Sequence, residues 1–441
     1  MSFTAILEGL PPGLSPLARY VCLRLVSRVC TSVDSVADEE ELLGQGTKAL
    51  AKVFGMADVK FAAATAELLK EGVFLDFGVS TGRGRPRRML RVSDKYRQLQ
   101  RENPVATAPG SELILRLLAL CCRSTESVGG EAWNISRARA ARKGGRLSVL
   151  NCLLACALCA KADSVGLVQG ISMHDLVKWT GLDLASVKHR IRRLAELGFI
   201  AVYVPGGNSP LLTHKRKSLY VMNLAHQAFQ GLEPVRFYPI LPPASDAWGW
   251  TLAGVAERFG RLEQLRLEGR RRTLLEAMMS WVERPEGRIH FLWAATDAEF
   301  FSRWLPWLIC GYVETVLQSE STQVSMRALV RALLPGKISE DFSSRLPGAQ
   351  DLWLELWNHY LPIVEAPEQP EPKWEADSPQ PKGSSQRGDV VTLICRYVFE
   401  VIQAIKSQHP TLSESQLKGA RLLWFDHEEQ GRGLVLALGH R

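Results

Sequence analysis

The stretch that decides the fold is residues 180–198, Thr-Gly-Leu-Asp-Leu-Ala-Ser-Val-Lys-His-Arg-Ile-Arg-Arg-Leu-Ala-Glu-Leu-Gly. Residues 180–182 predict a tight turn, Asp183 predicts the N-cap of a helix over 184–197, and Gly198 predicts its end. One side of this helix carries apolar residues at helical spacing, which predicts packing on a core: Leu184, Val187, Ile191, Leu194 and Leu197. The other side carries polar and basic residues, which we expect to point outward: Ser186, Lys188, His189, Arg190, Arg192 and Arg193.

The flanking sequence completes a compact unit around this helix. Ser148 predicts the N-cap of an apolar helix that runs to about Ala162, residues 163–170 are expected to be a connector, and a second helix covers 173–179. Two β-rich runs, 199–204 and 218–222, predict a returning hairpin. The loop between them, residues 205–217, contains a basic cluster: His214, Lys215, Arg216 and Lys217.

The segment 15–95 repeats this order of elements. Helices are expected over 18–30, 46–54 and 58–71, with a turn at 55–57 and Asp58 as the cap of the last helix. Strands are expected over 73–77 and 88–92. The outward side of helix 58–71 is only weakly basic and mostly small, with Lys60, Ala63, Ala64, Glu67 and Lys70.

The hairpin of this first segment has the strongest local motif in the chain, Thr-Gly-Arg-Gly-Arg-Pro-Arg-Arg over 81–88. Gly82 and Gly84 allow a backbone to approach a ligand closely. Narrow, electronegative minor grooves of DNA attract arginine, and the motif supplies four: Arg83, Arg85, Arg87 and Arg88. The alternative interpretation is a solvated basic turn.

Helix, turn, basic helix and basic hairpin, in that order and in two segments, resemble the winged helix-turn-helix family. The string Gly-Arg-Gly-Arg-Pro-Arg over 82–87 is similar to the wings of bacterial winged-helix regulators, and its Arg-Gly-Arg-Pro core resembles an AT-hook. The resemblance implies that the second helix of each turn enters the major groove and that the hairpin touches backbone or minor groove. The expected fold class is mainly α: two winged helix-turn-helix domains with small β-hairpin wings, followed by a helical C-terminal region.

Charge is distributed unevenly between the halves of the chain. Residues 1–230 hold 31 Lys and Arg against 19 Asp and Glu, whereas residues 231–441 hold 23 against 27. Clustered cations favour a polyanion such as nucleic acid, although a solvated basic surface has the same composition. A third basic stretch, residues 134–146, is expected to be a flexible arm along phosphates or an exposed linker; it contains Arg137, Arg139, Arg142 and Lys143.

Composition divides the chain into six parts. The expected boundaries are 15–98 and 145–228 for the two winged-helix domains, 99–144 for a helical and basic linker, 245–363 for a Trp-rich helical domain, 364–388 for a disordered linker and 389–441 for a small module of helix and hairpin. The Trp-rich segments, such as 304–309 and 352–358, suit either an internal core or an interface with a partner or second copy.

Several classes of protein are disfavoured by missing signals. The N-terminus lacks the basic start of a signal peptide, and the longest apolar stretch, 149–160, is shorter than a membrane span, so we expect a cytoplasmic, nucleoid-associated protein with no membrane partner. Cys152, Cys156 and Cys159 lie on one helix face and predict buried thiols; no metal and no cofactor is expected. Nucleotide-binding and catalytic motifs are also missing, which predicts that the chain is not an enzyme.

These observations predict a sequence-specific double-stranded DNA-binding protein, a transcriptional regulator whose C-terminal half forms a homo-oligomer or binds a protein partner. The first alternative is a replication initiator of a plasmid or other mobile genetic element, since such proteins also use tandem winged helices. The second is a protein-interaction scaffold, although winged helices that bind proteins usually lack basic wings.

Overall fold

The chain forms two compact units in a computed structural model. The first unit comprises residues 1–206 and 217–234, and the second comprises 207–216 and 235–441. The structure describes residues 3–31, 47–79, 87–96, 98, 109–122, 147–209, 212–229, 235–240, 303–319, 401–418, 420–427 and 431–438, with single positions at 261, 264, 265, 268, 269, 337, 341, 394, 397 and 398. The expected linker 364–388 lies outside the described residues, as does most of the Trp-rich region.

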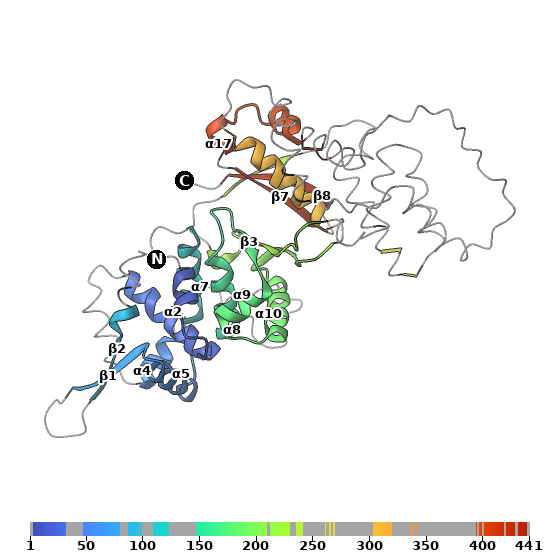
Figure 1. Cartoon of the computed structure of the whole chain (residues 1–441). Coiled ribbons are helices and arrows are strands. Elements are labelled where there is room, and N and C mark those ends of the chain that lie inside the picture. The colour runs from blue at the N-terminus through green and yellow to red at the C-terminus, as the bar shows by residue number, and fades with distance from the viewer. Residues whose placement is uncertain are drawn as a thin grey trace, which may run out of the picture. The chain divides into compact units, whose positions relative to one another are not determined.

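The described residues at the start of the first unit form helices and a hairpin. The helices are α1 (Phe3–Gly9), α2 (Pro16–Thr31), α4 (Thr47–Val53) and α5 (Asp58–Lys70). Strands β1 (Phe74–Val79) and β2 (Arg87–Val92) pair antiparallel, with Phe74 opposite Val92 and Val79 opposite Arg87. In Figure 1 this hairpin projects outward beyond α4 and α5. The elements expected from the sequence between 18 and 92 are therefore present.

The rest of the first unit is built on a second set of helices and a three-stranded sheet. Helix α7 (Pro109–Cys122) precedes α8 (Val149–Cys159), α9 (Met173–Thr180) and α10 (Leu184–Glu196). The sheet has the order β3-β5-β4, all antiparallel, from β3 (Leu167–Ile171), β4 (Ile200–Val204) and β5 (Ser218–Met222). A short 3-10 helix, η3 (Gln227–Phe229), ends the unit.

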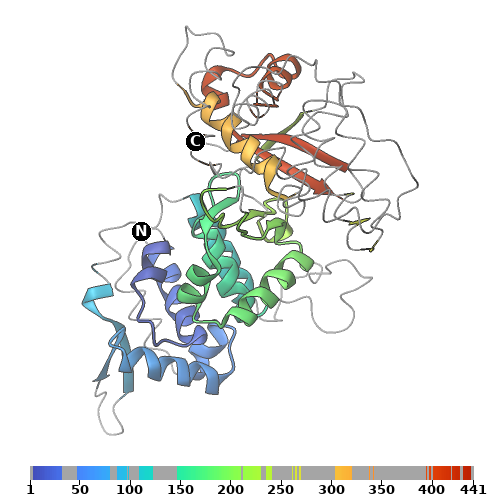
Figure 2. The ribbon, with the colours of Figure 1, turned by 45° about the vertical axis from the view of Figure 1, so that its right-hand side comes forward.

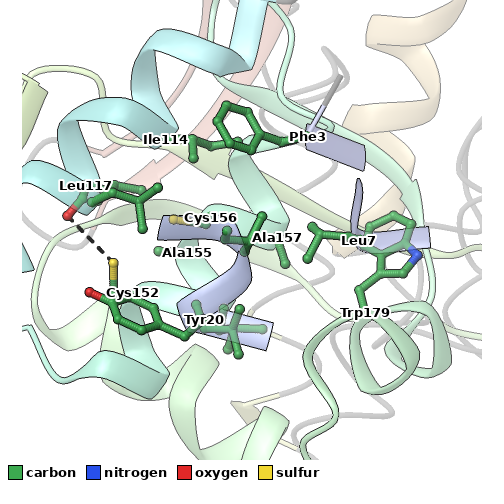
Figure 3. Close-up of a cluster of buried hydrophobic side chains, with 14 of the residues drawn as sticks. Phe3, Leu7, Tyr20, Ile114, Leu117, Cys152, Ala155, Cys156, Ala157 and Trp179 are labelled. Atoms are coloured by element: carbon green, nitrogen blue, oxygen red, sulfur yellow. Dashed lines mark hydrogen bonds between the residues drawn. The ribbon is translucent and has the colours of Figure 1, made fainter. Parts of the chain in front are cut away.

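One hydrophobic core joins the two segments that the sequence assigns to separate domains. It runs from Phe3 of α1 to Phe229 of η3, and α8 lies at its centre with every residue from 151 to 159 buried. Figure 3 shows Phe3 and Ile114 on one side of α8 and Tyr20 on another. The thiol of Cys152 donates to the carbonyl oxygen of Leu117 at 3.6 Å, so α7 also belongs to this core rather than to a linker.

Several local predictions are confirmed. Ser148 caps α8, since its side chain accepts from the backbone N–H of Asn151. The thiols of Cys152, Cys156 and Cys159 are buried, and none of the three is in a disulfide. Strand β5 has the predicted bounds, 218–222.

Other local predictions are wrong, and each has a physical reason. Residues 163–170 are not only a connector, because 167–171 form β3 against β5. Leu184 is 41 % exposed rather than buried, because it begins α10 beyond the reach of the core. The N-cap of α5 is Ala57, with no side-chain cap bond, and Asp58 is the first helical residue.

The guanidinium of Arg19 connects the two segments inside this core. Arg19 lies on α2 and is only 1 % exposed. Its nitrogens donate to backbone carbonyls of Pro11, Pro12 and Leu14 at 2.7, 3.1 and 3.0 Å, and to that of Trp179 at the end of α9 at 3.4 Å. Burial lowers the pKa of this guanidinium, which nonetheless stays cationic because arginine begins so high.

The second unit contains a small antiparallel sheet and a helix that covers it. Strand β6 (Arg236–Ile240) pairs with β8 (Gly431–Leu438), which pairs with β7 (Ala420–His427), all antiparallel. Helical residues 303–317 lie across this sheet in both Figure 1 and Figure 2. The Glu314 carboxylate accepts from Arg421 at 2.7 Å and from the backbone N–H of Leu422 at 2.8 Å.

The β7–β8 hairpin was predicted, but its partners were not. Residues 401–408 and α17 (Glu414–Lys418) precede it as helices. Strand β6 lies in none of the predicted domains, and it joins the sheet by pairing with residues far later in the chain, as in Arg236 opposite Leu438. The Trp-rich helix and the C-terminal module therefore form one unit, in which Trp304 and Trp307 are buried.

A methyl group at Gly110 should destabilise the first unit. A Cβ there would overlap the carbonyl oxygen of Cys159 and lie 2.9 Å from its carbon, so α7 would have to move off α8. We expect Gly110→Ala to cost about 2 kcal/mol or more, which lowers the melting temperature by roughly 4 °C or more. Gly311→Ala is the matched control, because Gly311 is helical with open space around its Cβ position and should gain about 0.5 kcal/mol. Equal thermal melting of the two variants would contradict the packing.

Replacement of Arg19 should loosen the contact between the two segments. Arg19→Met keeps the apolar stem but leaves the carbonyls of Pro11, Pro12 and Trp179 without their donor, and we expect a loss of about 3 kcal/mol. Arg91→Met is the control, because the exposed Arg91–Asp94 pair is worth less than about 1 kcal/mol. Chemical denaturation of both variants gives the comparison, and a cost for Arg19→Met no larger than that of the control would show that the buried contact contributes little.

Candidate nucleic-acid interface

Helix caps and hydrogen bonds fix the turn that joins α9 and α10. Ser172 caps α9 in a reciprocal arrangement: its hydroxyl accepts from the backbone N–H of Asp175 at 3.1 Å, and the Asp175 carboxylate accepts from the Ser172 N–H at 2.8 Å. Helix α9 ends at Gly181, whose φ of 68° lies in the left-handed region that favours glycine. The hydroxyl of Thr180 accepts from the N–H of Leu182 at 3.3 Å. The direction of α10 is therefore fixed before it begins.

Asp183 starts α10 as predicted. Its carboxylate accepts from the backbone N–H of Ser186 at 2.8 Å and from the Ser186 hydroxyl at 2.7 Å. The Ser186 side-chain bond, followed by the backbone bond, holds the pKa of the Asp183 carboxyl below its ordinary value. Ser186, which the sequence offers as a contact residue, positions the first turn of α10.

The outward side of α10 carries a row of exposed cationic and ionisable side chains. Val187, Ile191 and Leu194 are buried and hold the helix against the core. On the opposite side Lys188, His189 and Arg192 are exposed at i, i+1 and i+4, flanked by exposed Ala185 and Ala195. In the part of the chain that the structure describes, Lys188, His189 and Arg192 have no ion pair or side-chain hydrogen bond. We refer to these three residues as the α10 row.

The two other arginines of α10 already have partners within the first unit. Arg190 is half-buried, and its Nη1 donates to the Asn151 side-chain oxygen on α8 at 2.8 Å. Burial lowers its pKa. Arg193 lies 2.9 Å from the Glu196 carboxylate in an exposed pair within the helix. Arg190 therefore braces α10 against α8, which corrects its assignment as an outward contact residue.

Three basic residues of the loop between β4 and β5 have different surroundings. Lys215 is exposed. Lys217 donates to the carbonyl of Gly170 at 3.0 Å and lies 3.8 Å from the Asp175 carboxylate, so it turns back onto the first unit. Arg216 is 2.6 Å from the carboxylate of Asp341, and both residues belong to the second unit. Of these three cations, Lys215 is the one without such a contact in the described structure.

The described part of the β1–β2 hairpin includes two of its four predicted arginines, Arg87 and Arg88. Arg88 and Arg87 are the first residues of β2, opposite Gly78 and Val79 at the far end of β1. Residues 80–86, with Arg83 and Arg85, lie outside the described part of the chain. Lys60 is exposed on α5, beside Val59, which is 82 % exposed. The fourth predicted group, Arg137, Arg139, Arg142 and Lys143, also lies outside the described residues.

Sequence reasoning missed the residues that pair with Arg190 and Arg216, which are Asn151 and Asp341. Asn151 could have been found, because a polar side chain in the apolar run 149–160 must find a hydrogen-bond partner when that run is buried. Asp341 carries no such signal, since it is 125 residues from Arg216.

The described residues and the likeness of the chain to known proteins also bear on other functional classes. No cluster of three or more His, Cys, Asp or Glu suited to a metal occurs among the described residues. Within the same part of the chain, no helix has both the length and the apolar character that crossing a membrane requires. Comparison of the chain with protein-family models, with curated proteins and with solved structures finds no match.

The cap of α10 predicts a measurable titration. Because the pKa of Asp183 is lowered in the folded chain, its contribution to helix stability is present at neutral pH and is lost as the pH falls through that lowered value. We expect Ser186→Ala to raise the Asp183 pKa toward its ordinary value of about 3.9, because the side-chain donor is removed. NMR titration of the carboxyl carbons measures both values, with the Asp175 pKa as an unchanged internal control. An Asp183 pKa that is the same in both proteins would contradict this geometry.

Proposed function

We propose that the chain binds double-stranded DNA, with α10 as a recognition helix in the major groove. The observation that carries the proposal is the α10 row: Lys188, His189 and Arg192 are exposed and unpaired in the described structure, on a helix whose other side is fixed in the core. A major groove about 12 Å wide admits one α-helix, and arginine and lysine are the side chains best suited to guanine edges and to phosphates.

The surroundings of the row support an anionic ligand. Residues 147–229 hold nine Lys and Arg against four Asp and Glu. Two of the four acids, Asp175 and Asp183, cap helices and so serve the turn rather than neutralise the row. The capped turn and the Arg190–Asn151 bond fix the row in one orientation. A fixed orientation favours binding of a ligand whose groups are recognised by their position.

The β1–β2 hairpin supports a second point of contact. Its backbone brings Arg87 and Arg88 to the outer end of the strands, and the motif over 81–88 continues the basic run beyond them. Helix α5 is a poorer recognition surface, because its exposed residues include Val59, Ala62, Ala63 and Ala66, with Lys60 and Lys70 as cations. We therefore assign the first segment's DNA contacts to the arginine hairpin and the second segment's to α10, in tandem winged helix-turn-helix domains.

This arrangement suits a sequence-specific transcriptional regulator. The alternatives remain a replication initiator of a mobile element and a protein-interaction scaffold. Mapping the bound sequences in cells separates the first two: one palindrome beside a promoter supports regulation, whereas repeated sites at an origin support initiation.

Removal of the α10 row should weaken duplex binding and its salt dependence. We expect Lys188→Ala with Arg192→Ala to reduce affinity about tenfold to a hundredfold and to reduce the slope of log K against log salt by about one to two. Arg83, Arg85 and Arg87 changed together to Ala should reduce the slope by as much again. Fluorescence anisotropy with a labelled duplex at several NaCl concentrations measures both effects.

The control is Lys406→Ala, which removes an exposed cation from a helix of the second unit and should leave affinity within about twofold. Weak duplex binding that neither salt nor the two sets of substitutions alters would exclude the DNA hypothesis and favour the scaffold. An equal loss in the Lys406→Ala control would show that net charge alone is measured.

A further inference from the structure

The loop between β4 and β5 leaves the unit to which its strands belong. Strands β4 and β5 lie in the first unit, but residues 207–216 cluster with the second. Within that segment Ser209 and Leu212 are buried, and Gly207 and Arg216 exchange backbone hydrogen bonds at 3.1 and 2.9 Å. The described residues of the loop are therefore held by contacts of their own.

Asp341 holds this loop through both its backbone and its side chain. Its backbone carbonyl accepts from the N–H of Thr213 at 3.0 Å and from the Thr213 hydroxyl at 3.1 Å. Its carboxylate accepts from Arg216 at 2.6 Å through one oxygen and from the Tyr312 hydroxyl at 2.7 Å through the other. We refer to Thr213, Arg216, Tyr312 and Asp341 as the loop clamp.

Within the basic cluster over 214–217, the loop clamp binds Arg216. Lys215 is exposed, but the side chains of Arg216 and Asp341 are about three-quarters buried, with 25 % and 21 % exposed. A short, partly buried pair between a guanidinium and a carboxylate is among the stronger polar contacts in proteins. Tyr312 comes from helical residues 303–317, which also carry Glu314, so the clamp is attached to a helix that Glu314 holds against the sheet of the second unit.

We infer that Asp341 occupies Arg216 in place of a DNA phosphate, so that the loop clamp restrains DNA binding by the second segment. The inference rests on the proposed function. One carboxylate oxygen of Asp341 accepts from Arg216, as a phosphate oxygen would, while the other accepts from Tyr312. As long as this pair is formed, Arg216 cannot neutralise a phosphate. Opening of the clamp frees the Arg216 side chain for a phosphate, so the Arg216–Asp341 pair acts against DNA binding.

A double-mutant cycle tests the clamp. Asp341→Asn keeps the shape of the side chain but removes its charge, and we expect it to tighten duplex binding about threefold or more and to steepen the salt slope by about 0.9, the value for one phosphate contact. Arg216→Ala should change affinity less than about twofold, because Arg216 is already occupied. The double variant should return to the wild-type affinity. Glu8→Gln is the matched control for lost negative charge, since Glu8 belongs to an exposed pair with Lys161.

Two outcomes overturn the inference. If Arg216→Ala weakens wild-type binding as much as it weakens binding by the Asp341→Asn variant, Arg216 already contacts DNA. If Glu8→Gln tightens binding as much as Asp341→Asn, the effect is net charge rather than release of Arg216.

Hydrogen exchange separates failure of the clamp from failure of DNA binding. In Asp341→Asn the amides of Thr213 and Arg216 should exchange faster than in the wild type, and circular dichroism verifies that the variant is folded. Unchanged exchange would show that the Asp341 charge does not hold the loop, whatever the DNA result. Faster exchange with no duplex binding by any of the proteins would instead overturn the proposed function, together with the restraint that depends on it.

Discussion

The buried guanidinium of Arg19 is the contact on which the first unit depends. It collects backbone carbonyls from the chain before α2 and from the last turn of α9. Carbonyls at the C-terminus of a helix carry partial negative charge, so a cation placed there is favoured. Gly181 lies directly against Arg19, since a Cβ there would come within 2.9 Å of its Nε. The turn that aims α10 is therefore fixed by a residue of the first segment, and the two segments act as one body.

That single body explains why the basic residues of α10 differ in role although they are similar in sequence. Arg190 is drawn to Asn151 on α8, and Arg193 pairs with Glu196 within the helix. Lys188, His189 and Arg192 are left exposed on the opposite side. A cation binds an anionic ligand best when its backbone is fixed and its charge is not already paired. The core fixes the backbone of α10 and leaves the charges of the α10 row unpaired in the described structure. Burial of Val187, Ile191 and Leu194 supplies the anchoring.

In the second unit, anchoring by buried contacts leads to the pairing of a cation rather than to its exposure. Glu314 is 8 % exposed and is satisfied by Arg421 and the backbone of Leu422, which fixes its helix on the sheet. From that helix the Tyr312 hydroxyl donates to the Asp341 carboxylate, which also pairs with Arg216 of the basic cluster over 214–217. Positive charge counted along the sequence thus overstates the positive charge available to a ligand, because three of the arginines in the second segment are paired with the protein itself.

The sequence by itself determined the elements whose signals are local. The caps at Ser148 and Asp183, the stop at Gly181, the buried thiols of α8 and strand β5 all follow from hydrogen-bonding side chains and apolar spacing within a few residues of each other. It also placed Lys188, His189 and Arg192 on the outward side of α10, since amphipathic spacing distinguishes the two sides of one helix, but it did not separate them from Arg190 and Arg193. Only the tertiary structure decided that Leu184 is exposed, that α7 joins the core, that β6 pairs with β8 and that Arg190 and Arg216 are occupied. Those outcomes depend on contacts between residues far apart in the chain, and no local pattern records which distant group will satisfy a buried charge.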